Sequence, residues 1–202
     1  SWVNTHTVNV YRIQMDFLED SHLGDRLLIS SLPRKTSSHR ATYDQTIFDL
    51  DSGQTLVEAA VGLVFLNDEM ELVPVPDGVS ELPDLEIPRS QKRAAPVRFS
   101  DEVLSKFRMP IRVYYEDTDA QGITYHVAYI RFCERVINEL LNPNTKSIGL
   151  IDTGKSRSDE DWHAFRMKHM EIRFLESSKF DDRLEVLTGG RRLSANRAEL
   201  HQ

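Results

Sequence analysis

The chain has 202 residues, 40% of them hydrophobic and 28% charged, with a formal net charge of −7. This composition predicts a folded protein with a core, and the negative charge argues against nucleic-acid binding through a broad basic surface. No apolar run reaches the length of a membrane span, and the first residues, SWVNTHTVNVYR, lack the regions of a signal peptide. The single cysteine, Cys133, excludes an intrachain disulfide and a multi-cysteine zinc site. A cytoplasmic protein is expected.

Four segments in the first third of the chain are predicted to be strands. In VYRIQMDF, Tyr11, Ile13, Met15 and Phe17 alternate with polar residues, as in a half-buried strand. The segments DRLLISSL, RATYDQTIF and TLVEAAVGLVFL continue the series, with the turn DLDSG before the last. Residues 1–76 therefore form a series of antiparallel strands in this prediction.

A proline-rich stretch follows. Pro74 to Pro96 holds five of the eight prolines of the chain and includes SQKRAAP. Because proline disfavours helices and central strands, the stretch predicts a linker, over residues 77–107, between two domains.

The second domain, 108–202, begins with a strand and a helix. MPIRVYY is expected to be a strand, and from Val127 the apolar period becomes helical. The expected apolar stripe consists of Tyr129, Ile130, Cys133, Val136, Ile137, Leu140 and Leu141, with Arg131, Glu134, Arg135 and Asn138 facing away. NPN at 142–144 is expected to end the helix. One long helix beside several antiparallel strands predicts an α+β domain.

The chain also repeats itself. Residues 17–45 and 174–202, related by a shift of 157 residues without a gap, are identical at 12 of 29 positions. So long a period indicates duplicated domains. A counterpart of the Asp119 segment would lie about 38 residues before Ser1, so we expect this chain to be an internal part of a longer tandem protein. A divergent, permuted single domain is the alternative.

The segment YYEDTDAQGITYH places acidic residues directly before the predicted helix. A calcium loop is excluded, because Ala128 occupies the position that needs a bidentate glutamate. Two interpretations remain open. The turn is either a solvated acidic turn, or it holds a catalytic carboxylate near the backbone N–H groups of a helix N-terminus, which can polarise a carbonyl.

RVYYEDTDAQGITYHVAYIRFCER closely resembles the start of the 4-hydroxybenzoyl-CoA thioesterase and YbgC-type acyl-CoA thioesterase family, and HMEIRFLESSKFDDRLEV resembles its second and third strands. Residues 7–76 resemble the later strands of a similar domain. The resemblance implies a hotdog fold, in which an antiparallel sheet wraps around a long helix. It also implies paired domains, here a tandem hotdog with incomplete repeats, and thioester hydrolysis without a cofactor or a metal.

Carried over by position, the resemblance makes Asp119 the catalytic carboxylate, acting as base or as nucleophile. The turn Gly122, Ile123 and Thr124 and the N–H groups as far as His126 would stabilise the oxyanion. Tyr125 and His126 match the aromatic pair of the family. His126 would orient substrate or adjust the protonation of the carboxylate, and a structural histidine is an equal alternative. Asp117 and Glu116 would shape the turn or face solvent.

Two basic pairs superpose in the repeat, Arg34-Lys35 on Arg191-Arg192, and each is expected at a turn. They would bind the phosphates of CoA, with Arg34 and Lys35 expected to serve the Asp119 site, or form solvated hairpin tips. The substrate would be an acyl-CoA or an acyl-carrier-protein thioester. A hydratase is discounted because Thr124 stands where a histidine is needed, whereas a non-catalytic acyl-binding or scaffold module stays open. A homodimer is expected.

Overall fold

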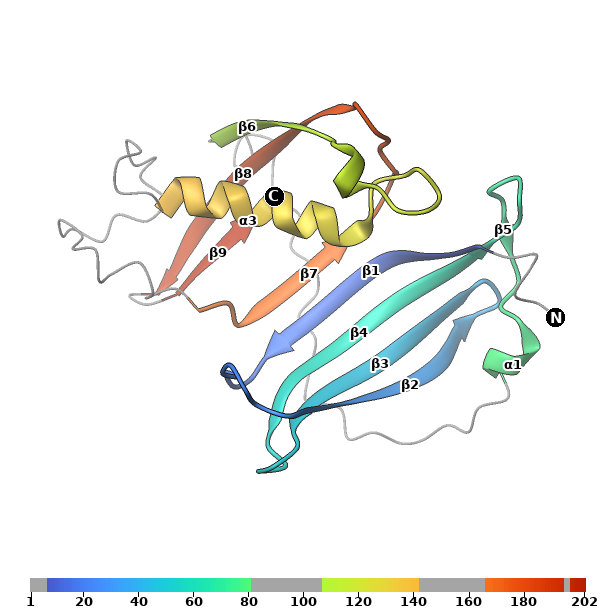
Figure 1. Cartoon of the computed structure of the whole chain (residues 1–202), viewed down its shortest axis with the longest axis horizontal. Helices are drawn as coiled ribbons and strands as arrows, with labels where there is room; N and C mark the ends of the chain where they lie inside the picture. The colour runs from blue at the N-terminus through green and yellow to red at the C-terminus, as the bar shows by residue number, and fades with distance from the viewer. Residues whose placement is uncertain (1–6, 81–106, 142–165, 195–196) are drawn as a thin grey trace. The chain divides into compact units, whose positions relative to one another are not determined.

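A computed structural model describes residues 7–80, 107–141, 166–194 and 197–202 (Figure 1). The chain divides into two compact units. Of the described residues, unit 1 holds 7–80 together with Arg166–Leu175, and unit 2 holds 107–141 together with those from Glu176 onward. The second part of the chain therefore contributes a segment to the unit that the first part builds. The boundaries expected at 76 and 108 stay a prediction.

Unit 1 is an antiparallel sheet with the strand order β2-β3-β4-β1-β7, and a short strand, β5, pairs with β4 (Figure 1). Its elements are β1 (Thr7–Phe17), β2 (Leu27–Ser37), β3 (Arg40–Asp49), β4 (Thr55–Leu66), β5 (Leu72–Val73), the single helical turn α1 (Asp77–Ser80) and β7 (His169–Arg173). The four long strands confirm the strands predicted from the apolar alternation.

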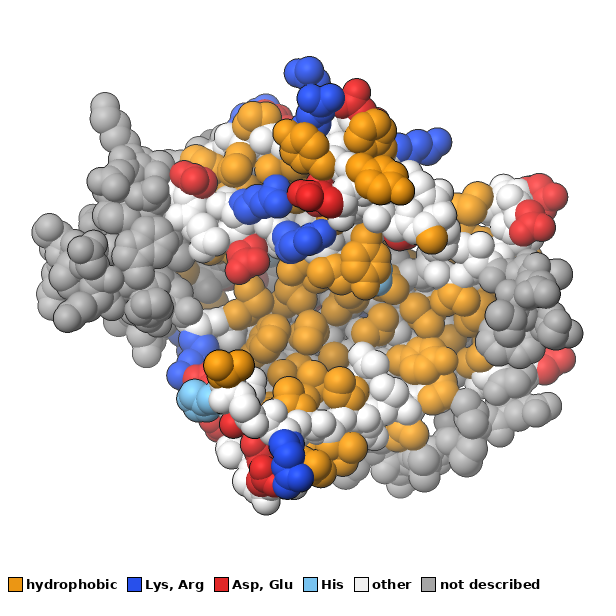
Figure 2. Space-filling view, viewed as in Figure 1, with side chains coloured by type: hydrophobic (Ala, Val, Ile, Leu, Met, Phe, Trp, Pro, Cys, Tyr) orange, Lys and Arg blue, Asp and Glu red, His pale blue; other side chains and the backbone are white. Residues whose placement is uncertain are grey.

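The strand register separates an apolar face of this sheet from a charged face. Ile13 of β1 lies opposite Val61 of β4 and Ile172 of β7, so their side chains share one face. On the other face, the guanidinium of Arg12 lies 3.0 Å from the carboxylate of Glu171. Figure 2 shows hydrophobic side chains gathered over the strands of this sheet. Period-two patterning therefore decides which side chains can form a core here.

The pairing of β1 with β7 follows the offset of the sequence repeat, although the paired residues lie directly before the repeated segments 17–45 and 174–202. Gln14 lies opposite Glu171, which is its own counterpart after the shift of 157 residues. Arg12 lies opposite Arg173, which is 157 residues after Asp16, and Asp16 lies opposite His169, which is 157 residues after Arg12. The strand pair is thus two-fold symmetric in register, with the axis between Gln14 and Glu171.

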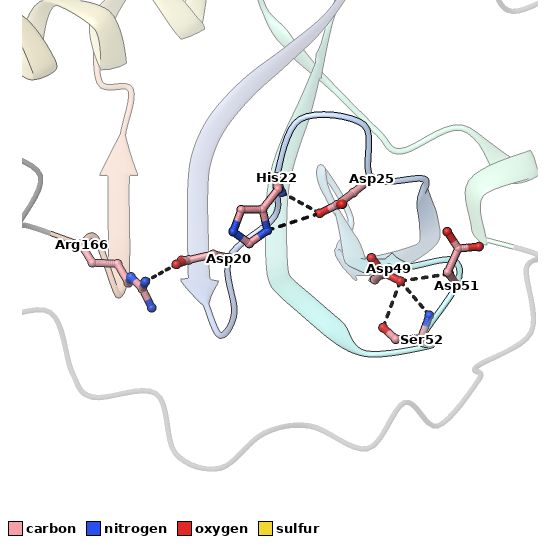
Figure 3. Close-up of polar contacts among 7 residues, drawn as sticks. All are labelled: Asp20, His22, Asp25, Asp49, Asp51, Ser52 and Arg166. Carbon is pink, nitrogen blue, oxygen red and sulfur yellow. Dashed lines mark hydrogen bonds and ion pairs between the residues drawn. The ribbon is translucent and has the colours of Figure 1, made fainter.

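Carboxylates hold the loops of unit 1 (Figure 3). Asp49 Oδ1 accepts hydrogen bonds from the N–H groups of Asp51 (3.0 Å) and Ser52 (2.7 Å) and from the Ser52 hydroxyl (3.0 Å). The backbone bond from Ser52 is the chief cause that lowers the pKa of Asp49 below its ordinary value. An ion pair between Asp20 and Arg166 joins the loop after β1 to the residues before β7. The turn predicted from DLDSG is confirmed.

Unit 2 packs one long helix against a three-stranded sheet of order β6-β8-β9. Its elements are β6 (Phe107–Arg112), a 3₁₀ turn (Tyr115–Asp117), α3 (His126–Leu141), β8 (Arg183–Ser194) and β9 (Arg197–His201). Ala128 and Phe132 of α3 are 0% and 1% exposed and form a core with Ile111 of β6. Leu184 and Val186 of β8 pack against the same core.

Three sequence expectations change in detail. The buried stripe of α3 is centred on Ala128, Phe132 and Val136. The predicted stripe did not include Ala128 and Phe132, because the larger, partly exposed apolar residues beside them fit the same helical spacing. The helix begins one residue before Val127 and its described part ends at Leu141, so residues 142–144 lie outside the described residues.

In the region expected to be a linker, Asp77–Ser80 form a helical turn where no helix was expected. Val79 of this turn packs against the core of Ala41, Phe65 and Val75. Residues 81–106 of the expected linker also lie outside the described residues.

Candidate active site

Backbone hydrogen bonds join the start of the segment between β6 and α3 to the loop before β8. Val113 is fully buried, its N–H donates to the carbonyl of Asp182 (2.9 Å), and its carbonyl accepts the N–H of Asp181 (3.0 Å). The chain then makes the 3₁₀ turn Tyr115–Asp117. Because both backbone groups of Val113 are bonded, the acidic turn that follows begins from a fixed point.

Asp117 is a buried structural carboxylate. It is 1% exposed, and its Oδ2 accepts the N–H of Tyr114 at 3.0 Å. Its carbonyl accepts the N–H of Tyr125 at 2.8 Å, and its Oδ1 lies 3.7 Å from Nη2 of Arg131 on α3. A buried carboxylate needs such partners, and these partners join the turn to the beginning of α3. Of the roles expected for Asp117, shaping the turn agrees with these contacts.

Asp119 lies on a tight turn two residues later and is partly exposed. Its Oδ1 accepts the N–H of Gln121 (2.8 Å), its N–H donates to the carbonyl of Ile123 (2.9 Å), and its carbonyl accepts the N–H of Gly122 (3.0 Å). Gly122 has φ +75°, a conformation that favours glycine. The turn therefore holds the Asp119 backbone firmly while its carboxylate reaches the surface.

The N–H groups considered for an oxyanion site have different partners. Those of Thr124 and Tyr125 donate to the carbonyls of Ser178 and Asp117, each at 2.8 Å. The N–H of Gly122 donates within the turn itself, to the carbonyl of Asp119 (3.0 Å). An oxyanion role for the expected N–H groups, from Gly122 to His126, stays a prediction.

His126 begins α3 and is partly buried. Its ring meets the Tyr125 ring edge-on, with 4.5 Å between ring centres. Burial lowers the pKa of His126 below its ordinary value, and the negative charge of Asp119 acts in the opposite direction. Asp119 and His126 are therefore close enough to interact electrostatically.

Two further features border the turn. Ser178 bonds to both Thr124 and Tyr129, a contact that sequence reasoning did not find because a lone serine in a loop carries no motif. An open hollow of about 450 Å³ is lined by Tyr114, Tyr115, Glu116 and Phe180.

The basic pairs lie inside strands, which corrects their expected place at turns. Arg34 and Lys35 belong to β2, and Arg191 belongs to β8. Arg34 Nε lies 3.0 Å from Asp44, and Arg191 Nε lies 2.8 Å from Glu199. Arg192 is also within β8. Cross-strand carboxylates thus compensate both described guanidinium groups, and a role in CoA binding stays a prediction.

Within the described ranges, no group of three or more histidine, cysteine, aspartate or glutamate residues could hold a metal ion. Across the same residues, no helix is long and apolar enough to cross a membrane.

The chain is similar in sequence to known thioesterases over part of its length. Over 82 residues it is 37% identical to the acyl-CoA thioester hydrolase YbgC of Escherichia coli O6:H1 and 40% identical to the acyl-CoA thioesterase YbgC of Haemophilus influenzae. Each match covers 41% of this chain and 56% of the relative, so the chain spans about half the length of the curated relatives it matches. No protein-family model matches the chain.

Solved structures extend the similarity to nearly the whole chain at the level of fold. An acyl-ACP thioesterase from Bacteroides thetaiotaomicron matches 98% of this chain over 71% of its own, with a TM-score of 0.67 and 14% identity. The 12:0-ACP thioesterase from Umbellularia californica matches 96% over 73% of its own chain, with a TM-score of 0.64 and 14% identity. The chain therefore has the α+β hotdog-like fold of the tandem acyl-ACP thioesterases, and part of its sequence is homologous to YbgC acyl-CoA thioesterases.

Proposed function

We propose that this chain carries the catalytic turn of a thioesterase that hydrolyses an acyl-CoA or acyl-carrier-protein thioester. The observation that carries the proposal is the placement of Asp119: a partly exposed carboxylate, held on a tight turn, whose charge acts on the first residue of α3. The sequence similarity to YbgC thioesterases and the fold of acyl-ACP thioesterases support the same substrate class.

Two routes use this geometry. As a base, Asp119 takes a proton from water while the water oxygen attacks the thioester carbonyl, and the C–S bond of the resulting tetrahedral intermediate then breaks to release the thiolate and the acid. As a nucleophile, its carboxylate attacks the carbonyl carbon, the thiolate leaves, and water hydrolyses the mixed anhydride that results. In both routes the carbonyl oxygen becomes an oxyanion, which backbone N–H groups near the beginning of α3 stabilise. Mass spectrometry after rapid quenching separates the routes, because only the nucleophilic route adds an acyl group to the peptide that contains Asp119.

The two roles left open for His126 follow from its protonation. With a lowered pKa, its imidazole is neutral at pH 7 and places no positive charge beside the Asp119 carboxylate. A neutral ring can also accept a hydrogen bond from substrate or donate one to it.

The proposal also includes contacts for the phosphates of a CoA thioester, which the two basic pairs would supply: Arg34, Lys35, Arg191 and Arg192.

Asp119→Asn tests the proposal on a panel of acyl-CoA and acyl-carrier-protein thioesters. We expect kcat to fall by roughly 10²-fold or more, because the amide is neither a base nor a nucleophile of use here. Glu116→Gln, an exposed carboxylate in the same segment, is the matched control and should keep wild-type kcat.

The alternative function, a non-catalytic acyl-binding or scaffold module, predicts a different outcome. Such a module would bind acyl-CoA with equal affinity in the wild-type and Asp119→Asn proteins and would hydrolyse none of the panel. An Asp119→Asn protein that turns over its best thioester at the wild-type rate would end the proposed mechanism.

A further inference from the structure

Three hydroxyl groups meet beneath the Asp119 turn. Ser178 Oγ lies 2.7 Å from Thr124 Oγ1 and 2.8 Å from Tyr129 Oη, and the Ser178 N–H donates to Tyr129 Oη at 2.9 Å. Thr124 and Ser178 are buried, 4% and 8% exposed. A buried hydroxyl is costly when it loses its partner, so this cluster holds its members in one arrangement.

The cluster joins three pieces of chain that otherwise follow separate courses. Thr124 closes the Asp119 turn, where it bridges Thr118. Tyr129 lies in the first turns of α3, and Ser178 lies in the loop between β7 and β8. The backbone adds to the connection, because the Thr124 N–H donates to the Ser178 carbonyl (2.8 Å).

Because Thr124 is bonded to Ser178, the end of the Asp119 turn cannot shift relative to α3 without breaking this cluster. Asp119 is connected to the cluster through Ile123, the residue before Thr124, because the Asp119 N–H donates to the Ile123 carbonyl. Displacement of a reacting group by about 1 Å can cost up to about a hundredfold in rate. The cluster is therefore placed to set the distance between the carboxylate and the start of α3.

We infer that Ser178 is a positioning residue of the thioesterase, which acts through Thr124 and Tyr129 to hold the Asp119 carboxylate in a fixed position relative to the start of α3. The inference rests on the proposed function, because it assigns Ser178 to the same reaction. It predicts a change in turnover rather than in substrate affinity, since Ser178 itself contacts no substrate in this role.

Kinetics of Ser178→Ala test the inference, with the exposed neighbour Ser177→Ala as the matched control. We expect kcat to fall about tenfold in Ser178→Ala while KM stays within roughly a factor of two, and Ser177→Ala to match the wild type. Tyr129→Phe should show the same pattern. In an Asp119→Asn background, Ser178→Ala should cause no further loss, because the group that it positions is already disabled. A multiplicative loss in that background would assign Ser178 a general structural role and overturn the inference.

The failures are distinguishable. An Asp119→Asn protein with wild-type kcat overturns the proposed function and the positioning role together, whereas a large loss in Asp119→Asn beside wild-type kcat in Ser178→Ala overturns the positioning role alone. Amide hydrogen exchange gives a readout independent of activity. The Thr124 amide should exchange at least about tenfold faster in Ser178→Ala, with the later amides of α3 unchanged, and unchanged exchange at Thr124 overturns the inference.

Discussion

His126 illustrates how two neighbouring effects decide one protonation state. Burial disfavours the imidazolium, while the carboxylate of Asp119 favours it, and the net result is a pKa below the ordinary value of 6.5. Unfolding removes both effects. Between the lowered pKa and 6.5, the unfolded chain therefore binds more protons at this residue than the folded chain does.

This difference predicts a pH dependence of stability. In that pH window the contribution of His126 to the free energy of unfolding rises with pH, and above it the ring is neutral in both states and contributes no slope. We therefore expect stability to fall as the pH is lowered below 6.5, and His126→Gln to reduce that fall. Urea unfolding at a series of pH values measures it. His22→Gln, in an exposed loop where the side chain is 83% exposed, is the control, and identical slopes in wild-type and His126→Gln proteins would contradict the prediction.

The two aspartates of the motif show where sequence reasoning stops at this scale. The resemblance separates Asp119 from Asp117 by position in a motif. The burial of Asp117 depends on Arg131, which lies 14 residues later, and on the N–H of Tyr114. The contact with Arg131 has no local signal, and a carboxylate in a polar turn has the same pattern whether it points inward or outward.

At the scale of elements, β4 shows a packing constraint that no periodicity reveals. An added Cβ at Gly62 would lie 2.7 Å from Cε1 of Tyr11 and 2.8 Å from its Cζ. Tyr11 stands where the register of β1 against β4 shifts, and the guanidinium of Arg40 lies 5.1 Å from the centre of its ring. The ring therefore lies against the glycine, and the guanidinium of Arg40 also packs on it.

Gly62→Ala should consequently destabilise the protein, although alanine fits a strand better than glycine elsewhere. We expect the free energy of unfolding to fall by about 1–3 kcal/mol, the usual cost of overpacking a core. Chemical denaturation measures it. If the clash with Tyr11 is the cause, Gly62→Ala with Tyr11→Ala should cost less than the sum of the single changes, and strict additivity would point to another cause.

The elements also show what patterning can predict. The strands β1 to β4 and the helix α3 follow from period-two and helical spacing, because burial of one face selects those spacings. The short strand β5 and the turn α1 escape such an argument, since two or four residues span only about one period, which is too short to show a repeating pattern. Their places are decided by contacts distant in sequence, such as Phe65 opposite Val73 and Val79 against the core of Ala41.

For the molecule as a whole, the repeat is the strongest feature of the sequence, and the pairing of β1 with β7 gives it a structural meaning. The residues directly before the two repeated segments pair antiparallel, symmetrically about the pair of Gln14 and Glu171. Sequence reasoning found the repeat and the α+β class. It could not predict that the strand His169–Arg173 joins the sheet of unit 1, because strand partners are chosen by shape and charge across the sheet, such as Arg12 beside Glu171.

The last prediction concerns the edge of that sheet. Among the described strands, β2 has a neighbour on one side only, and its residues Leu27, Leu28 and Ile29 are 47%, 51% and 59% exposed. An apolar edge strand is a template for pairing with another chain, so we expect this protein to form a dimer at micromolar concentrations. Light scattering coupled to size-exclusion chromatography measures the mass. Ile29→Lys should weaken association at least about tenfold, because a charge on an edge strand opposes pairing. Leu50→Lys, at a turn residue of similar exposure, 49%, should leave association unchanged. A monodisperse monomer throughout the micromolar range, or a dimer indifferent to Ile29→Lys, would show that this edge does not recruit a second copy.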